Sequence, residues 1–180
     1  MALKATVFKA TIQFSDLVHH DYRTIDLTLA RHPSETDLRL MVRLAAWMFS
    51  ASQNPVFTRG LSTAGEPDIW VLEPTGDIRA WIDVGLPDAR RIRKACQQAA
   101  EVLVYAYGDR NAATWRHQSA EDWRRFDRLV VEYFPTAQCK ALEQLSHRNM
   151  KLQCTLEDRD MYLSDESQAV HLCPERWYPG

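Results

Sequence analysis

The stretch Glu66–Gln98 constrains the fold most, because it combines two short strands, a tight turn and a helix start with acids at the strand ends. The β-branched and aromatic runs Ile69–Leu72 and Ile78–Val84 are typical of strands. Between them, Pro74-Thr75-Gly76-Asp77 has the composition of a turn. The stretch therefore predicts a hairpin followed by a helix.

The register of this hairpin decides which acids meet. If Thr75-Gly76 is a two-residue loop, Pro74 faces Asp77 and the ladder continues until Asp68 faces Asp83. Opposed Cβ atoms lie about 4.5–5.5 Å apart, so two carboxylates there need a proton or a cation. A hard cation such as Mg²⁺ binds one or two carboxylates and keeps its other positions for water and phosphate. The alternative is that both aspartates are solvated strand ends in a slipped register.

A helix is predicted from Pro87 to about Tyr107, ending before Gly108, with Pro87 at its entrance. Its first turns are basic, through Arg90, Arg91, Arg93 and Lys94. Two interpretations stay open: an anion-binding helix start beside the acids, or a solvated basic face.

Two strands, Leu3–Phe14 and Tyr22–Ala30, are predicted to form a hairpin, with a helix after it. Ser34 is the predicted N-cap of that helix, in a capping-box pattern with Asp37. Glu35 falls on the same stripe as the apolar residues that follow. If this carboxylate faces the core, it needs a partner, a proton or a metal. The alternative is a favourable interaction between the carboxylate and the helix N-terminus, as is common for first-turn acids.

The rest of the chain is less informative. A strand is predicted at Phe126–Phe134, a helix at Thr136–Leu145, a hairpin at Met150–Leu163 and a short strand at Ala169–Leu172. The aromatic residues of this part are interpreted as packing residues rather than base-stacking ones; they are Trp115, Trp123, Tyr133, Trp177 and Tyr178.

Composition limits the function classes. The 180 residues suit one domain over 1–180, and a net charge of −2 excludes a global basic field. Four scattered cysteines without a CxxC pair give no support for a zinc or redox motif. No signal peptide is recognised and no apolar run approaches the ~20 residues of a membrane span. We therefore expect a cytoplasmic location and no membrane partner.

The chain closely resembles the YaeQ family of bacterial proteins in the segments LKATVFKATI, LTLARHPSETD, FTRGLS, EPDIW, WIDVGLPD and RRIRKACQQAAEV. The resemblance implies an α+β fold, with a mixed β-sheet flanked by helices. It also implies a PD-(D/E)XK nuclease-like core with additional strands.

The superfamily pattern implies roles for individual residues. Pro67-Asp68 matches the "PD" and Asp83 the second acid, while the Val84 carbonyl stands at the variable position. Glu35 resembles the extra helix-borne acid of many superfamily members.

The motif lysine is missing, because Gly85 occupies its position. Lys94 is the natural substitute, and Gln98 resembles the glutamine that superfamily helices present near the site. At about 100° per residue, however, Lys94 lies nearly opposite Ile92 around the helix. If the apolar face packs flat on the sheet, Lys94 points away from Asp83 unless its long side chain curls round the helix start. Arg91 or Arg93 is the electrostatic alternative, although neither acts as a base, because arginine stays protonated.

The resulting hypothesis is a metal-dependent nuclease acting on DNA or RNA. Asp68, Asp83 and Glu35 would hold Mg²⁺, with Mn²⁺ as the alternative ion, and hydrolysis would use a metal-activated water. Lys94 would orient that water or neutralise the phosphate, and the candidate substrate contacts are Arg31, His32, Arg59 and Arg91. The alternatives are a catalytically silent nuclease fold that binds nucleic acid or a protein, and a small-molecule phosphoesterase.

Overall fold

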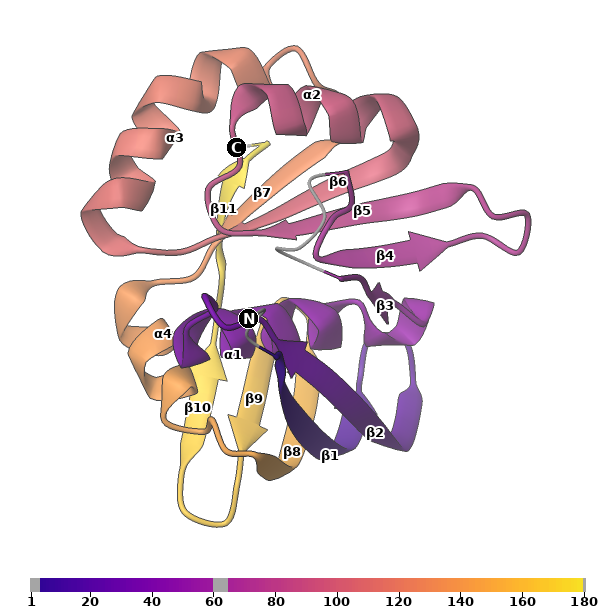
Figure 1. Ribbon diagram of the computed structural model, residues 1–180, viewed down its shortest axis with the longest axis vertical. Helices are drawn as coiled ribbons and strands as arrows, with labels where there is room; N and C mark the ends of the chain where they lie inside the picture. The colour runs from indigo at the N-terminus through magenta and orange to yellow at the C-terminus, as the bar shows by residue number, and fades with distance from the viewer. Residues whose placement is uncertain (1–3, 60–64, 180) are drawn as a thin grey trace. The chain divides into compact units, whose positions relative to one another are not determined.

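The computed structural model describes residues 4–59 and 65–179, and the chain forms two compact units (Figure 1). Unit 1 comprises the described residues up to Ser52 together with Ala137–Cys173, and unit 2 comprises Gln53–Thr136 and the C-terminal segment from Pro174. The predicted α+β class, with mixed β-sheet flanked by helices, is confirmed, and the strands form two sheets. One domain over 1–180 stays a prediction.

Unit 1 holds a five-stranded mixed sheet in the order β10-β9-β8-β1-β2. Its elements are β1 (Thr6–Asp16), β2 (Asp21–Arg31), α1 (Asp37–Phe49), a short 3₁₀ turn (Ala51–Gln53), α4 (Thr136–Glu143), β8 (Asn149–Glu157), β9 (Asp160–Ser164) and β10 (Ala169–Leu172). The predicted β1–β2 and β8–β9 hairpins are both confirmed. β1 is parallel to β8 and antiparallel to β2, so it lies inside the sheet.

The strands of unit 1 have one buried and one exposed face. In β1, Phe8, Ala10, Ile12 and Phe14 are buried, and the residues between them are mostly exposed. This alternation is the period of two that a half-buried strand requires. The same pattern continues in β8, where Met150, Leu152, Cys154 and Leu156 are buried.

Unit 2 holds a six-stranded sheet in the order β11-β7-β6-β5-β4-β3. Its elements are β3 (Val56–Phe57), β4 (Ile69–Leu72), β5 (Ile78–Val84), α2 (Ala89–Gln98), β6 (Ala99–Ala106), α3 (Asp109–Trp123), β7 (Leu129–Tyr133) and β11 (Glu175–Tyr178). β5, β6 and β7 are parallel, and α2 and α3 are the two crossovers. Figure 1 shows both helices on the same side of this sheet, as crossovers of one hand require when strands are added in one direction.

The predicted helix from Pro87 to Tyr107 is wrong beyond Gln98. α2 ends there and β6 begins at Ala99. Val102, Val104 and Ala106 are buried in a two-residue period, and β-branched residues at that spacing favour a strand over a helix. Ala99, Leu103 and Ala106 therefore belong to a strand and not to the apolar face of a helix.

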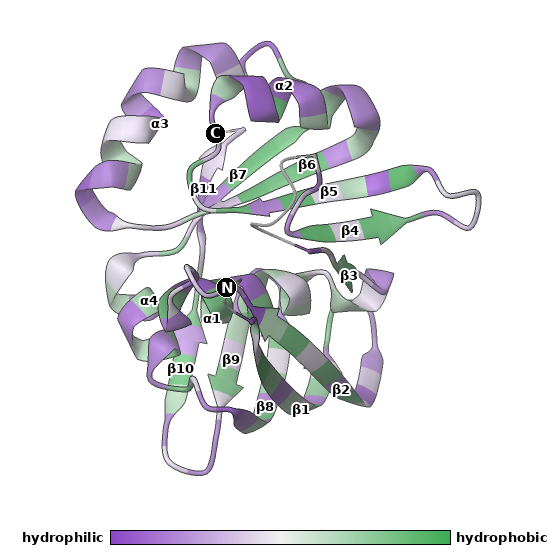
Figure 2. Cartoon of the chain, viewed as in Figure 1, coloured by the Kyte–Doolittle hydropathy of each residue, from purple (hydrophilic) through white to green (hydrophobic). Residues whose placement is uncertain are grey.

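The core on the helix-covered face of unit 2 forms around Trp81, Ile92, Val102, Val104 and Trp123. Figure 2 shows the apolar strands of this sheet beneath two mainly hydrophilic helices. The helices therefore contribute narrow apolar stripes, and the strands supply most of the apolar surface.

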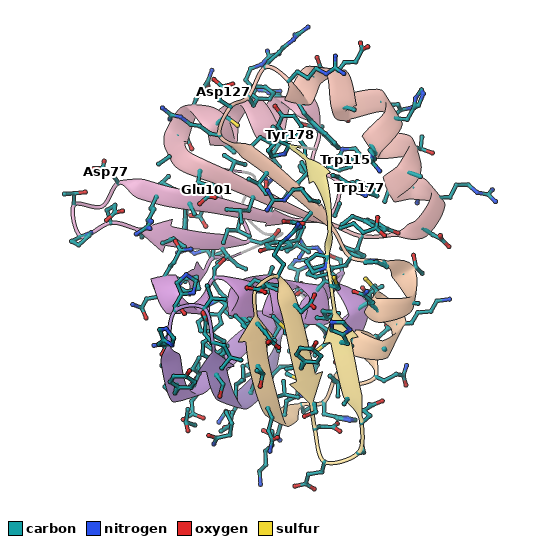
Figure 3. The ribbon with its side chains drawn as sticks, turned by 180° about the vertical axis from the view of Figure 1, so that it is seen from behind. Asp77, Glu101, Trp115, Asp127, Trp177 and Tyr178 are labelled. Carbon is teal, nitrogen blue, oxygen red and sulfur yellow. The ribbon has the colours of Figure 1, made fainter. Side chains whose placement is uncertain are left out.

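The interpretation of the aromatic residues as packing residues is confirmed. Trp115 and Trp123 lie 4.9 Å apart between ring centroids, and Tyr133 stacks on Trp177 at 4.2 Å. Tyr178 packs against Trp123 at 6.1 Å. Figure 3 shows Trp115, Trp177 and Tyr178 close together where β11 meets the helices. This aromatic cluster anchors the C-terminal strand.

No helix within residues 4–59 and 65–179 has both the length and the apolar character needed to cross a bilayer.

Candidate metal-binding acid site

The β4–β5 hairpin has the predicted register beside the acids. Ile69 pairs with Ile82, Trp70 with Trp81 and Val71 with Ala80. The paired ladder ends at Ile69 and Ile82, and the Asp68 amide also donates to the Ile82 carbonyl at 3.1 Å, so Asp68 adjoins the end of β5 beside Asp83 without being a regular ladder partner of it. Because Trp70 and Trp81 meet edge-on across the strands, alternation puts both aspartates on their face of the sheet, the one α2 covers.

The turn that produces this register differs from the prediction. The Glu73 carbonyl accepts from the Gly76 amide at 2.8 Å, and the Glu73 amide donates to the Asp77 carbonyl at 2.9 Å. Gly76 has φ +90°, which is the left-handed position of a three-residue loop. The predicted two-residue loop is therefore wrong.

A β-bulge compensates for the longer loop. Leu72 pairs with Ile78 and Val71 with Ala80, so Arg79 is the extra residue. The loop shifts the pairing by one residue and the bulge shifts it back. The two irregularities cancel before the acids are reached.

Both aspartates are buried, at 3% exposure for Asp68 and 2% for Asp83. The interpretation of the two as solvated strand ends in a slipped register is therefore wrong. Asp68 accepts a hydrogen bond from the Val84 amide at 2.8 Å through Oδ2. This bond ties the start of β4 to the end of β5 and fixes the carboxylate beside Asp83.

Asp83 is held by Arg91, the third residue of α2. Nε donates to Oδ2 and Nη2 to Oδ1, each at 2.7 Å. Arg91 also donates to the Glu66 carbonyl at 2.8 Å, and its guanidinium lies 5.9 Å from the centre of the Trp81 ring. A two-bond fork of this kind is the strongest pairing available between an arginine and a carboxylate. Sequence reasoning placed Arg91 among the phosphate contacts and missed this pair. The available signal was the position of Arg91 in the first turn of α2, directly after the N-cap Asp88 and close in sequence to the end of β5.

Burial is the largest influence on the pKa of Asp83 and raises it above its usual value near 3.8. Arg91 acts in the opposite direction, and the charge of Asp68 adds to the increase. Between 3.8 and the raised pKa, the native state binds more protons than the unfolded state. The contribution of Asp83 to the free energy of unfolding therefore falls as pH rises through that window.

We expect Asp83→Asn to lack this decrease, because an amide does not ionise. The measurement is urea unfolding of both proteins from about pH 3 to pH 7. The free energy of unfolding of the parent should fall relative to that of the variant as pH rises. A relative increase would mean that Arg91 outweighs burial and lowers the pKa.

Lys94 lies on the same side of α2 as Arg91. Its ammonium is 3.4 Å from the Gly65 carbonyl, next to the Glu66 carbonyl that Arg91 binds. Ile92 and Ala95 form the buried stripe of α2. Lys94 lies beside this stripe, and its side chain reaches the segment before Asp68 instead of pointing away from the acid site. Gln98 is the exposed last residue of α2.

Glu35 belongs to unit 1, where two arginines bind it. Arg43 donates to both carboxylate oxygens at 3.0 Å, and Arg39 donates to Oε1 at 2.9 Å. The predicted N-cap at Ser34 is wrong, because Thr36 caps α1 and the helix begins at Asp37. Glu35 therefore precedes the helix, and the expected need for a partner is met by the arginines.

Of the other predicted substrate contacts, two have partners within unit 1, and Arg59 follows Thr58, whose amide donates to the Asp68 carbonyl at 3.2 Å. Arg31 pairs with Asp37, and the His32 ring is 2.6 Å from the Ser34 hydroxyl, both in unit 1. Arg59 is exposed after β3 in unit 2. From the predicted set, the structure brings together Asp68, Asp83, Arg91 and Lys94. Of the matching segment Phe57–Ser62, positions 60–62 lie outside the described residues.

The acid site offers two carboxylates. Across residues 4–59 and 65–179, no three His, Cys, Asp or Glu side chains gather as a metal-binding group. Two oxygen donors match Mg²⁺, which takes one or two carboxylates and keeps the other positions for water and phosphate.

The family model of the YaeQ protein matches residues 1–174. The chain belongs to the YaeQ family. It is 42% identical over 177 residues to the YaeQ proteins of Escherichia coli (strain K12) and Salmonella typhi, covering 98% of each chain. The crystal structure of YaeQ from Xanthomonas axonopodis pv. citri matches with a TM-score of 0.90 and 40% identity, over 96% of this chain and 97% of that one. The YaeQ structure from Pseudomonas syringae matches with a TM-score of 0.91 and 26% identity, over 98% and 97%. The family predicted from the sequence segments is thus confirmed, and YaeQ crystal structures share the fold.

Proposed function

We propose that this member of the YaeQ family is a metal-dependent nuclease located in the cytoplasm, with a PD-(D/E)XK-like core formed by unit 2. The observation that supports the proposal is the pair Asp68 and Asp83. Both carboxylates are buried on the α2-covered face at the end of the β4–β5 hairpin. Burying two neighbouring carboxylates costs folding free energy, and a divalent cation bound between them would offset that cost.

Asp68 and Asp83 would hold Mg²⁺ or Mn²⁺. The ion, when bound, supplies a Lewis acid and a water of lowered pKa. The Val84 amide keeps Asp68 in place, and Lys94 offers a cation to a phosphate from the same side of α2. Glu35 as a further ligand stays a prediction, and it requires the carboxylate to leave Arg43 and Arg39.

Arg91 is central to the proposed chemistry. Its fork occupies both oxygens of Asp83, so a cation takes its place only if the guanidinium moves away. An arginine released in this way stays protonated and binds phosphate through the same fork. Metal binding and phosphate recognition would then be linked through one side chain.

The same pair favours a second candidate function. A carboxylate neutralised by arginine needs no metal, and Gly85 stands where the motif lysine is expected. A catalytically silent fold that binds nucleic acid or a protein partner fits these two features.

The test is cleavage of single- and double-stranded DNA and RNA with Mg²⁺ or Mn²⁺, with and without chelator. We expect cleavage by the parent to stop in chelator and to fall about 100-fold or more in Asp83→Asn. Asp77→Asn, in the exposed hairpin turn, is the matched control and should keep full activity. If parent and Asp83→Asn give equal traces, the activity is a contaminant. If neither protein cuts, the silent fold is the better conclusion.

A further inference from the structure

A second basic site lies in unit 2 between α2 and the loop that follows α3. It is a cavity of about 260 Å³. Arg93, Cys96 and Gln97 line it from α2, and the segment from Arg125 to Arg128 lines the opposite wall. Figure 3 shows Asp127 in this loop, beside the helix layer of unit 2.

The cavity is separate from the acid site. Arg93 and Cys96 lie on a different face of α2 from Arg91 and Lys94, since three-residue steps along a helix keep one face. Arg128 donates to the Ala99 carbonyl at 3.3 Å, and Ala99 pairs with Ile78 at the start of β5. Asp83 lies five residues further along β5, about 17 Å away at the usual rise per residue.

Three arginines and one aspartate line this cavity. Arg93 and Arg128 form no ion pair with any other residue of the described ranges. Arg125 pairs with Asp122 only at 3.5 Å, with 70% and 47% of the two side chains exposed, so this pair is weak and readily exchanged. Asp127 is the opposing charge in the wall. The lining therefore has a net positive charge, and the ion pair between Arg125 and Asp122 neutralises it only weakly.

We propose that this cavity binds the phosphate group of a nucleotide or of a nucleic-acid strand. Guanidinium forks match phosphate oxygens in geometry and charge, and arginines from two elements can grip one group from opposite sides. Phe126 adds an apolar ring to the wall, on which a sugar or base packs. The proposal goes beyond the nuclease function and does not depend on it.

Cys96 lines the cavity and serves as the reporter. Burial raises the pKa of its thiol and Arg128 acts in the opposite direction, so its modification is measured at alkaline pH. Cys139 and Cys154 are buried, and burial raises the pKa of each to about 12, so both react slowly. Cys173 is exposed and is removed by Cys173→Ser. In that background, modification of Cys96 by a small thiol reagent reports on occupation of the cavity.

The experiment measures the rate of Cys96 modification with three probes at constant ionic strength. The probes are inorganic phosphate, a nucleoside monophosphate, and an oligonucleotide without terminal phosphate. We expect the probes to protect Cys96 from modification, with protection that saturates as probe concentration rises. The dissociation constant should be about tenfold larger in Arg93→Gln or Arg128→Gln. Asp127→Asn should bind more tightly. Arg110→Gln, on exposed α3 outside the cavity, is the matched control and should bind like the parent.

The outcomes separate the two sources of phosphate. Protection by the monophosphate alone assigns the cavity to nucleotides, and protection by the oligonucleotide alone assigns it to the strand backbone. Calorimetric titration of the same probes into the same proteins gives a parallel measurement that does not depend on thiol reactivity. The proposal is overturned if no probe binds, or if Arg93→Gln and Arg128→Gln bind as tightly as Arg110→Gln.

Discussion

Replacing Glu35 with leucine is expected to lower the free energy of unfolding by about 3–5 kcal/mol, because it leaves a buried arginine without its counter-charge. Arg43 has 4% of its side chain exposed and makes both of its carboxylate bonds to Glu35. Its bond to the Ala30 carbonyl would remain, but that neutral acceptor supplies no counter-charge. Urea unfolding at neutral pH, followed by far-ultraviolet circular dichroism, measures the loss.

Two control variants show whether the loss comes from the unpaired charge. The double variant Glu35→Leu/Arg43→Met should recover most of the stability, since removing both partners leaves no buried charge from this pair. Glu73→Leu breaks an exposed pair with Arg79 at 3.8 Å and should change the free energy by less than about 1 kcal/mol. If Glu35→Leu unfolds like the parent and loses only metal-dependent cleavage, then Glu35 is a metal ligand and not an anchor of α1.

Replacing Arg91 with methionine is expected to destabilise the protein by about 3 kcal/mol at neutral pH, because Asp83 stays buried beside Asp68 without its counter-charge. The same change opens both oxygens of Asp83. If the two acids form a metal site, Mg²⁺ should raise the melting temperature of Arg91→Met more than that of the parent, since the ion no longer competes with the guanidinium. Thermal unfolding across a Mg²⁺ titration measures both effects.

Arg90→Met is the matched control, because Arg90 is the exposed neighbour of Arg91 on α2. It should leave stability and the response to Mg²⁺ unchanged. A destabilised Arg91→Met that Mg²⁺ does not restore would count against the metal site. The Asp83–Arg91 pair would then be structural, and the silent binding fold would be favoured.

The acid pair could be predicted from the sequence, although the route to it was partly wrong. The strands, the turn region and the register beside the acids follow from alternation and turn composition. The bulge at Arg79 could not be predicted, because nothing local distinguishes it from the next strand residue. The register was correct because the loop and the bulge shift the pairing by equal and opposite amounts.

The boundary at Gln98 shows a limit of periodicity. Ala99, Leu103 and Ala106 fit a helical stripe that continues from Ile92 and Ala95, while Val102 and Val104 fit a strand. Local propensity does not decide between these patterns when a helix runs directly into a strand. Pairing with β5 and β7 decides it, and that information lies elsewhere in the chain.

Arg39, which binds Glu35, stands at the four-residue spacing of helix neighbours, but the other partners of the site residues could not be predicted from the sequence. Asp83 binds Arg91 and Glu35 binds Arg43 over separations of eight residues, which is beyond the three- and four-residue spacing of helix neighbours. Each pair forms only once the adjoining elements have packed. The sequence therefore identified the acids, and the folded structure was needed to show that arginines neutralise them.

The placement of β1 affects how the chain folds during synthesis. Its parallel partner β8 begins at Asn149, so most of the protein is made before Lys9 can meet that residue. Until then, β1 and β2 emerge as a hairpin whose inner edge has open hydrogen-bonding groups. Such an edge is a template for unwanted pairing between chains. The ribosome completes the three parallel strands of unit 2 before β8, so β1 is among the last strands to gain its full set of native neighbours.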